Sequence, residues 1–145
     1  MPYPVDQHGP PPGVLRGQGA ATAVVSLGGA LGALARWGLG LALPAAPGTF
    51  PLGTFLINAA GCLLMGALVV LVAEAREAHP LVRPFAGVGV LGGFTTFSTF
   101  ATDGQLLLAG GRPVLGGLYL AGTAGASVGA AAVGLAVTRR LTGVR

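Results

Sequence analysis

The sequence is short of charged residues. Only 8% of its 145 residues are charged, against about 25% in a typical soluble domain. So few charged side chains cannot cover a water-soluble surface, and 52% of the residues are hydrophobic. The composition therefore predicts an integral membrane protein, and the length predicts a single domain.

Lysine is absent, and the formal net charge of +4 rests on eight arginines. A basic chain can bind nucleic acid, but no basic cluster here is interleaved with aromatic residues. The arginines are instead typical of loop residues that set the orientation of a membrane protein.

The groups that most enzymes need are also missing. The four acidic residues are scattered, and His8 and His79 stand alone, so no catalytic or metal cluster is predicted and the protein is not expected to be an enzyme. The single cysteine, Cys62, cannot form an internal disulfide and is predicted to be a small core residue.

What the chain does contain is four apolar segments, each about 20 residues long and so able to cross a bilayer as a helix. Short connections make sequential helices antiparallel neighbours. The sequence predicts an all-α membrane protein whose transmembrane helices lie at about 20–43, 52–73, 85–108 and 114–137.

Two tails flank the predicted transmembrane domain at 20–138. Residues 1–19 are rich in proline and glycine, lack the pattern of a signal peptide, and are predicted to be disordered. Residues 139–145 are predicted to form a basic cytoplasmic tail.

The arginines are distributed unevenly between the two sides of the predicted membrane. With a cytoplasmic N-terminus, Arg112 lies outside, Arg36 lies within a helix, and six others lie inside. The sequence predicts a multi-pass plasma-membrane protein with both termini in the cytoplasm. The six inside residues are Arg16, Arg76, Arg83, Arg139, Arg140 and Arg145.

The third apolar segment contains the most unusual stretch, residues 92–100. Two consecutive glycines are followed by hydroxyl residues interleaved with phenylalanines. Lipid tolerates a broken backbone only where it faces protein or a water-filled path. We predict a break at Gly92-Gly93, and carbonyls freed there, such as those of Gly92 and Thr95, can coordinate a monovalent cation.

Each polar residue within the spans has a functional and a structural interpretation. Arg36 either extends to the headgroups or lines an anion-attracting vestibule, and Asp103, at similar depth, either pairs with it or is structural. Asn58, with Thr54 on the same face, either joins helices or donates N–H to an anion.

Phe97 and Phe100 share a helix face. They either pack in the core or present their positive ring edges to a dehydrated anion. Glycines at Gly28, Gly32 and Gly40 and at 122, 125 and 129 allow close helix packing. Four helices are too few to enclose a pore, so oligomerisation is expected.

Three motifs resemble the Fluc (CrcB) family of fluoride channels. They are the glycine-arginine run at 28–37, the run at 53–61 that holds Thr54 and Asn58, and the run at 92–100. The resemblance covers about residues 20–138. It implies an antiparallel, dual-topology-type dimer with two pores and passive fluoride efflux that lowers cytoplasmic fluoride toxicity.

The resemblance also implies roles for individual residues. Arg36 matches the vestibule arginine, Asp103 stands where the family has glutamate, and the carbonyls of Gly92 and Thr95 match donors to a structural Na⁺ at the dimer centre. The residues implied to line the fluoride pore are Phe97, Phe100, Asn58, Thr54, Ser98, Thr99, Ser127 and Tyr119.

Three alternatives remain from the sequence. The arginine bias favours an antiparallel heterodimer with a paralogous subunit over a homodimer, since dual-topology subunits need little bias. A non-conducting partner subunit is the second alternative. A small four-helix multidrug transporter is the third, but it needs a carboxylate in helix one, where this chain has Arg36.

Overall fold

The structure is a computed structural model that describes residues 18–73 and 79–143. All secondary structure in these ranges is helical, and four helices are long and apolar enough to cross a membrane, as predicted. Residues 1–17, 74–78 and 144–145 lie outside the described residues. They include most of the tail predicted at 1–19, of which Gly19 is already the first residue of a helix. The elements are α1 (Gly19–Ala42), α2 (Leu52–Ala73), η1 (Pro84–Leu91), α3 (Gly92–Phe94), α4 (Phe97–Ala109) and α5 (Pro113–Thr142).

The third span, Pro84–Ala109, is assembled from three elements, of which the first, η1, is a π-helix. Pro84 and Pro113 stand in the first turn of η1 and α5, where a missing N–H costs nothing. Gly143 ends α5 with φ of 69°, a left-handed conformation that suits glycine. Arg139 and Arg140 lie in the last turn of α5.

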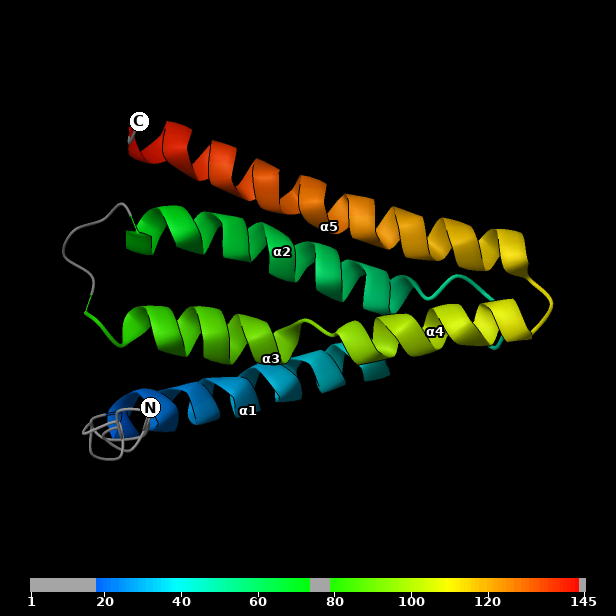
Figure 1. Ribbon diagram of the computed structural model, residues 1–145, viewed down its shortest axis with the longest axis horizontal. Helices are drawn as coiled ribbons and strands as arrows, with labels where there is room; N and C mark the ends of the chain where they lie inside the picture. Colours follow the sequence, from blue (N-terminus) through cyan, green and yellow to red (C-terminus); the bar gives the residue numbers. More distant parts are fainter. Residues whose placement is uncertain (1–17, 74–78, 144–145) are drawn as a thin grey trace, which may run out of the picture.

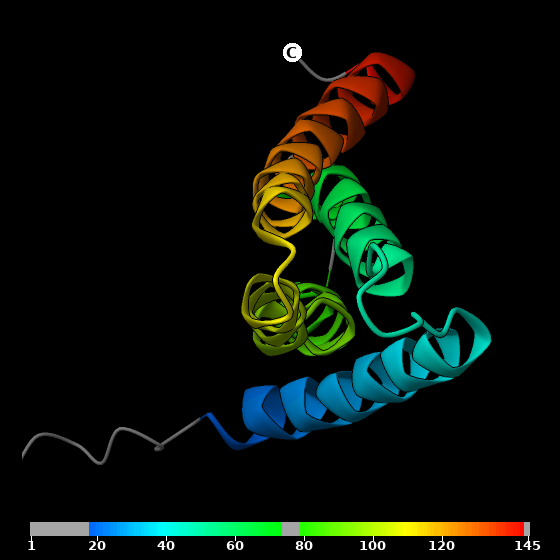
Figure 2. The ribbon, with the colours of Figure 1, turned by 90° about the vertical axis from the view of Figure 1, so that its right-hand side faces the viewer.

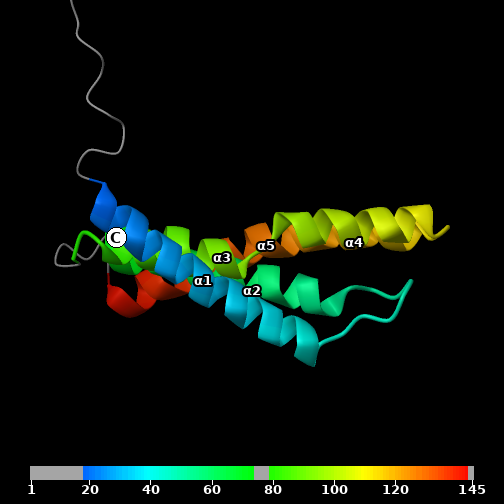
Figure 3. The same ribbon diagram turned by 90° about the horizontal axis from the view of Figure 1, so that it is seen from below.

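The four spans form an open bundle, in which the helices do not close around a common axis. In Figure 1, α5, α2, the third span and α1 follow one another from top to bottom. Figures 2 and 3 show α1 running obliquely across the third span. The start of α1 and the end of α5 lie at the same end of the bundle (Figure 1), as an even number of spans requires.

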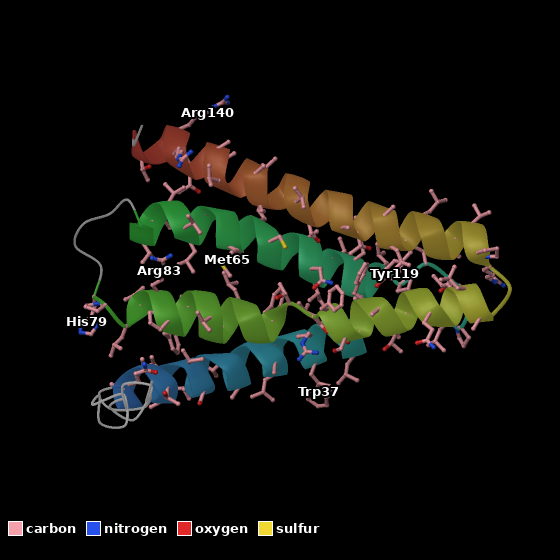
Figure 4. All side chains as sticks on the ribbon, in the orientation of Figure 1. Trp37, Met65, His79, Arg83, Tyr119 and Arg140 are labelled. Atoms are coloured by element: carbon pink, nitrogen blue, oxygen red, sulfur yellow. The ribbon has the colours of Figure 1, made fainter. Side chains whose placement is uncertain are left out.

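The two ends of the bundle differ in their connections. Arg83, Arg140 and His79 lie at the end where α1 begins (Figure 4). At the other end, the Arg112 Nη1 donates a hydrogen bond to the Gly48 carbonyl at 2.5 Å. This contact ties the α1–α2 connection to the α4–α5 connection.

Glycines permit close helix contacts, for example between α1 and η1 and between α2 and α5. A Cβ on Gly28 would meet the Phe85 carbonyl at 2.6 Å, which sets the approach of α1 to η1. Between α2 and α5, a Cβ on Gly134 would overlap the Leu63 carbonyl. The predicted glycine face of the fourth helix does not pack in this way, because Cβ atoms at 122, 125 and 129 would meet nothing within 4 Å.

Few large side chains are buried. Tyr119 and Val70 are the largest fully buried side chains of the described residues. Many leucines and valines are exposed on all four spans. Such a surface suits lipid or a second subunit, because lipid removes the need to hide apolar side chains from water.

We predict that Gly134→Ala destabilises the protein by about 1–3 kcal/mol, because its Cβ cannot fit against the α2 backbone. Gly117→Ala, on the same helix with nothing within 4 Å, is the matched control and should be neutral or slightly stabilising. Thermal unfolding in detergent, followed by Trp37 fluorescence, measures both. Equal melting temperatures would show that α2 and α5 tolerate a wider spacing.

Candidate functional site

The backbone of the third span leaves the helical conformation at Thr95 and Thr96, and not at the predicted Gly92-Gly93. Gly92 is helical, with φ of −65° and ψ of −36°. Thr95 (φ −74°, ψ 158°) and Thr96 (φ −144°, ψ 124°) are extended. The predicted position was wrong because glycine permits a break without requiring one; hydrogen bonds to Thr96 decide where the helix stops.

Asn58 makes two hydrogen bonds to the backbone of Thr96. Its Oδ1 accepts from the Thr96 N–H at 2.8 Å, and its Nδ2 donates to the Thr96 carbonyl at 3.0 Å. The side chain is 8% exposed. Asn58 therefore joins α2 to the third span, which is the structural role that the sequence left open. An amide carries two N–H donors, so one remains for another acceptor.

The Thr96 hydroxyl organises the start of α4. It accepts from the Thr99 N–H at 3.1 Å, as a helix N-cap does, and it donates to the Thr99 Oγ1 at 3.1 Å. The Ser98 hydroxyl lies 3.3 Å away. Sequence reasoning gave no role to Thr96, although a threonine directly before a helical segment is a recognised capping signal.

These contacts leave backbone carbonyls without their helical donors. In a continuous helix the Thr96 N–H would donate to the Gly92 carbonyl, but here it donates to Asn58. The Thr99 N–H donates to the Thr96 hydroxyl instead of the Thr95 carbonyl. The Gly92 and Thr95 carbonyls are thus the kind of oxygen donors that unwound membrane helices offer to a monovalent cation.

Arg36 reaches back to the same segment. Its Nε donates to the Gly93 carbonyl at 3.1 Å. This hydrogen bond joins α1 to the third span, and the vestibule role of Arg36 stays a prediction. Trp37, the next residue, points away from the bundle (Figure 4).

Asp103 binds hydroxyl groups from two other helices. Its Oδ2 accepts from the Thr54 hydroxyl at 2.7 Å and from the Tyr119 hydroxyl at 3.4 Å. Asp103 thus connects α4 to α2 and α5. Arg36 and Asp103 line one cavity, but their hydrogen bonds go to these other groups.

Most of the predicted site residues line one of two cavities that share Thr96, whereas Ser98, Tyr119 and Gly92 line neither. The arginine cavity, of about 390 Å³, is lined by Arg36, Asp103, Thr54 and Thr99 among others. The phenylalanine cavity has about 360 Å³. It is lined by Asn58, Cys62, Thr95, Thr96, Phe97, Phe100, Thr123, Ala124, Ser127 and Val128.

The aromatic rings form a chain beside these cavities. Phe97 and Phe100 have centroids 5.7 Å apart, and Phe100 lies 5.6 Å from the Tyr119 ring. Tyr119 is 0% exposed and also packs edge-on against Phe50 at 5.4 Å, so it is enclosed within this chain. Phe97 is 80% exposed, so other residues of the chain leave most of it uncovered.

Thr123 is a candidate that sequence reasoning missed. It is 2% exposed, and within the described part of the chain its Oγ1 is the buried side-chain polar atom without a hydrogen-bond partner. It lines the phenylalanine cavity together with Ser127, one helical turn further along. The four-residue spacing of Tyr119, Thr123 and Ser127 was the available signal.

Comparison with known proteins identifies the family. Residues 23–135 match the family model described as CrcB-like protein, Camphor Resistance (CrcB). The chain is 53% identical over 108 residues to fluoride-specific ion channel FluC 1 of Streptomyces coelicolor, covering 74% of this chain and 70% of that protein.

Two further relatives are named fluoride-specific ion channel FluC 2. The protein of Nocardia farcinica is 47% identical over 119 residues, covering 82% of this chain and 85% of its own length. The protein of Streptomyces avermitilis is 49% identical over 107 residues, covering 74% of this chain and 68% of that protein. These relatives are ion channels and not enzymes. With four membrane spans and this match, the chain is a multi-pass membrane protein that belongs to the CrcB family of fluoride-specific ion channels.

Proposed function

We propose that this protein is a subunit of a fluoride-specific channel in the plasma membrane that lets fluoride leave the cell passively and so lowers its toxicity. The observation that carries the proposal is the phenylalanine cavity. It combines two phenylalanine rings, the unpartnered hydroxyl of Thr123 and the spare N–H of Asn58 in a membrane-spanning bundle. The names of the relatives supply the identity of the ion.

The chemistry of fluoride fits these groups. Fluoride is small and strongly hydrated, so a pore must replace its water with donors at close range. Hydroxyls, an amide N–H and ring edges can do so without a fixed charge. Binding is then strong enough for entry and weak enough for exit.

Arg36 has a different role in this proposal. Its guanidinium lines the arginine cavity and raises the local concentration of anions at the mouth. Thr54 and Asp103 line the same cavity, and Thr99 connects it to the start of α4. Thr96 lines both cavities, so the proposed fluoride route passes the Thr95-Thr96 segment.

The freed carbonyls support a structural Na⁺ that is not transported. Gly92 and Thr95 would hold it, and its positive charge would compensate carbonyl dipoles that have lost their helical donors. The Arg36 contact to the Gly93 carbonyl stabilises the same segment from the side of α1.

We further propose an antiparallel dimer. One protomer leaves Phe97 80% exposed and forms an open bundle, so a second subunit is needed to enclose a narrow path. Arginine placement favours a partner of opposite orientation encoded separately, with both termini of this chain in the cytoplasm. Among the relatives, Streptomyces avermitilis has both a FluC 2 and a FluC 3, so paralogues coexist in one organism.

The test of the function is ion release from liposomes that contain this protein alone, read with fluoride and chloride electrodes. We expect rapid fluoride release without chloride release if the chain forms a homodimer. If this protein alone releases no fluoride, but does so when co-expressed with a paralogue, the channel is a heterodimer. Equal release of both anions would contradict the proposal, and export of organic cations would support the multidrug alternative.

We predict that Phe97→Ile combined with Phe100→Ile abolishes fluoride release while the protein still assembles, because aliphatic side chains keep the bulk but lack the positive ring edges. The measurement is fluoride efflux together with size-exclusion chromatography. Phe85→Ile, in η1 and outside both cavities, is the control and should conduct. Full flux in the double variant would remove the aromatic role.

We predict that Asn58→Asp impairs both stability and fluoride flux. The Thr96 carbonyl loses its donor, which costs about 1–3 kcal/mol of unfolding free energy, and the new negative charge repels fluoride. Gln105→Glu makes the same chemical change at an exposed position of α4 outside both cavities and should be tolerated. If flux is unaltered while stability falls, Asn58 only joins helices.

A further inference from the structure

A third hollow, separate from the arginine and phenylalanine cavities, lies between α2 and η1. It has a volume of about 220 Å³ and is lined by apolar side chains of α2, among them Leu68 and Val72, by Gly87 and Val88 of η1, and by Arg83. No residue of the two cavities lines it. Val88 is 66% exposed, so this hollow, the Arg83 groove, opens on the surface of the bundle.

The charge at this groove has no partner within the described part of the chain. Arg83 is exposed and makes no hydrogen bond or ion pair there. The carboxylate that the described residues contain, that of Asp103, lies in the other half of the same span and is bound by Thr54 and Tyr119. Arg83 directly precedes Pro84, the first residue of the third span, so its guanidinium lies at the level of the lipid headgroups.

The apolar part of the groove runs from this level into the hydrocarbon region. Val72 stands next to the end of α2, and Met65 lies two turns deeper, about 10 Å along the helix. Gly87 leaves the space between α2 and η1 open, since a Cβ there would meet the Leu68 Cδ2 at 3.4 Å. A hollow of this length and chemistry fits the first part of one acyl chain.

We propose that the Arg83 groove binds an anionic phospholipid. The Arg83 guanidinium holds the phosphate, for which its planar fork of N–H donors is suited, and one acyl chain lies along α2 and η1. Basic pockets between membrane helices are a known type of site for anionic headgroups. The negative net charge of the lipid complements the unpaired arginine, whereas the choline group of a zwitterionic lipid offsets its phosphate.

A second copy of this chain fits the groove less well. In an antiparallel dimer the end of the partner that holds Arg112 lies at the level of Arg83, so it brings a like charge. The proposal does not depend on the channel function, because it rests on the groove and on the unpaired charge.

The experiment counts lipids bound to the full chain by native mass spectrometry, in titrations with phosphatidylglycerol or with phosphatidylcholine of the same acyl chains. Arg83→Gln removes the charge and Arg83→Lys keeps it. Arg140→Gln is the matched control, because it removes the same charge at the same end of the bundle from an exposed side chain that lines none of the three hollows (Figure 4). Gly87→Val fills the groove and leaves Arg83 in place, with folding checked by size-exclusion chromatography.

We expect phosphatidylglycerol to bind more tightly than phosphatidylcholine. Arg83→Gln should weaken its binding about fivefold, the loss expected for one arginine beside an anionic headgroup, and Arg140→Gln should leave it nearly unchanged. Arg83→Lys should retain most of the binding, and folded Gly87→Val should lose it. If Gly87→Val does not fold, the comparison of Arg83→Gln with Arg140→Gln decides.

Four results would overturn the proposal. Equal binding of the two lipids would remove the role of charge. Equal losses in Arg83→Gln and Arg140→Gln would show a general attraction of a basic surface for anionic lipid, with no site at the groove. Displacement of the lipid by excess inorganic phosphate would show that the guanidinium takes a free anion. Lipid binding that is confined to the monomer would show that a second subunit covers the groove.

Discussion

The pair of hydrogen bonds between Asn58 and the Thr96 backbone is the constraint on which the rest of the site depends. By taking the Thr96 N–H away from the Gly92 carbonyl, Asn58 stops the helix in the interior of the bundle and holds the extended segment against α2. In lipid an unsatisfied backbone group costs several kcal/mol, so a helix can end at this depth only where such a partner is supplied. One amide side chain supplies both the acceptor and the donor.

The position of the extended segment determines what lies on either side of it. The Thr96 hydroxyl caps α4 and draws Thr99 towards it, while Arg36 binds the Gly93 carbonyl on the side of α1. The arginine cavity and the phenylalanine cavity consequently meet at Thr96. Arg36 and Asp103 line one cavity, and neutral polar groups with aromatic rings line the other; in the proposed channel an anion would be attracted at the first and stripped of water at the second.

Much of the fold could be predicted from the sequence, because a helix needs about 20 apolar residues to cross a membrane and such runs can be recognised by their length. The expected segments 20–43, 52–73, 85–108 and 114–137 agree with the observed spans to within a residue, except that α5 continues to Thr142. Asn58, Phe97, Phe100 and Ser127, which the resemblance implied to line the pore, line one cavity. Thr54 and Thr99 line the other cavity instead.

The sequence by itself determined the four spans, the end of the bundle at which each connection lies, and the family. These follow from apolar length, loop length and local motifs. Tertiary structure decided where the third span leaves the helical conformation, which backbone groups Asn58 and Arg36 bind, and that Thr123 and Cys62 share a cavity. Each of these depends on contacts between residues of different helices, such as the 38 positions that separate Asn58 from Thr96. Glycine pairs and runs of hydroxyl residues show where a helix can break. The hydrogen-bond partner on a neighbouring helix fixes where it does break.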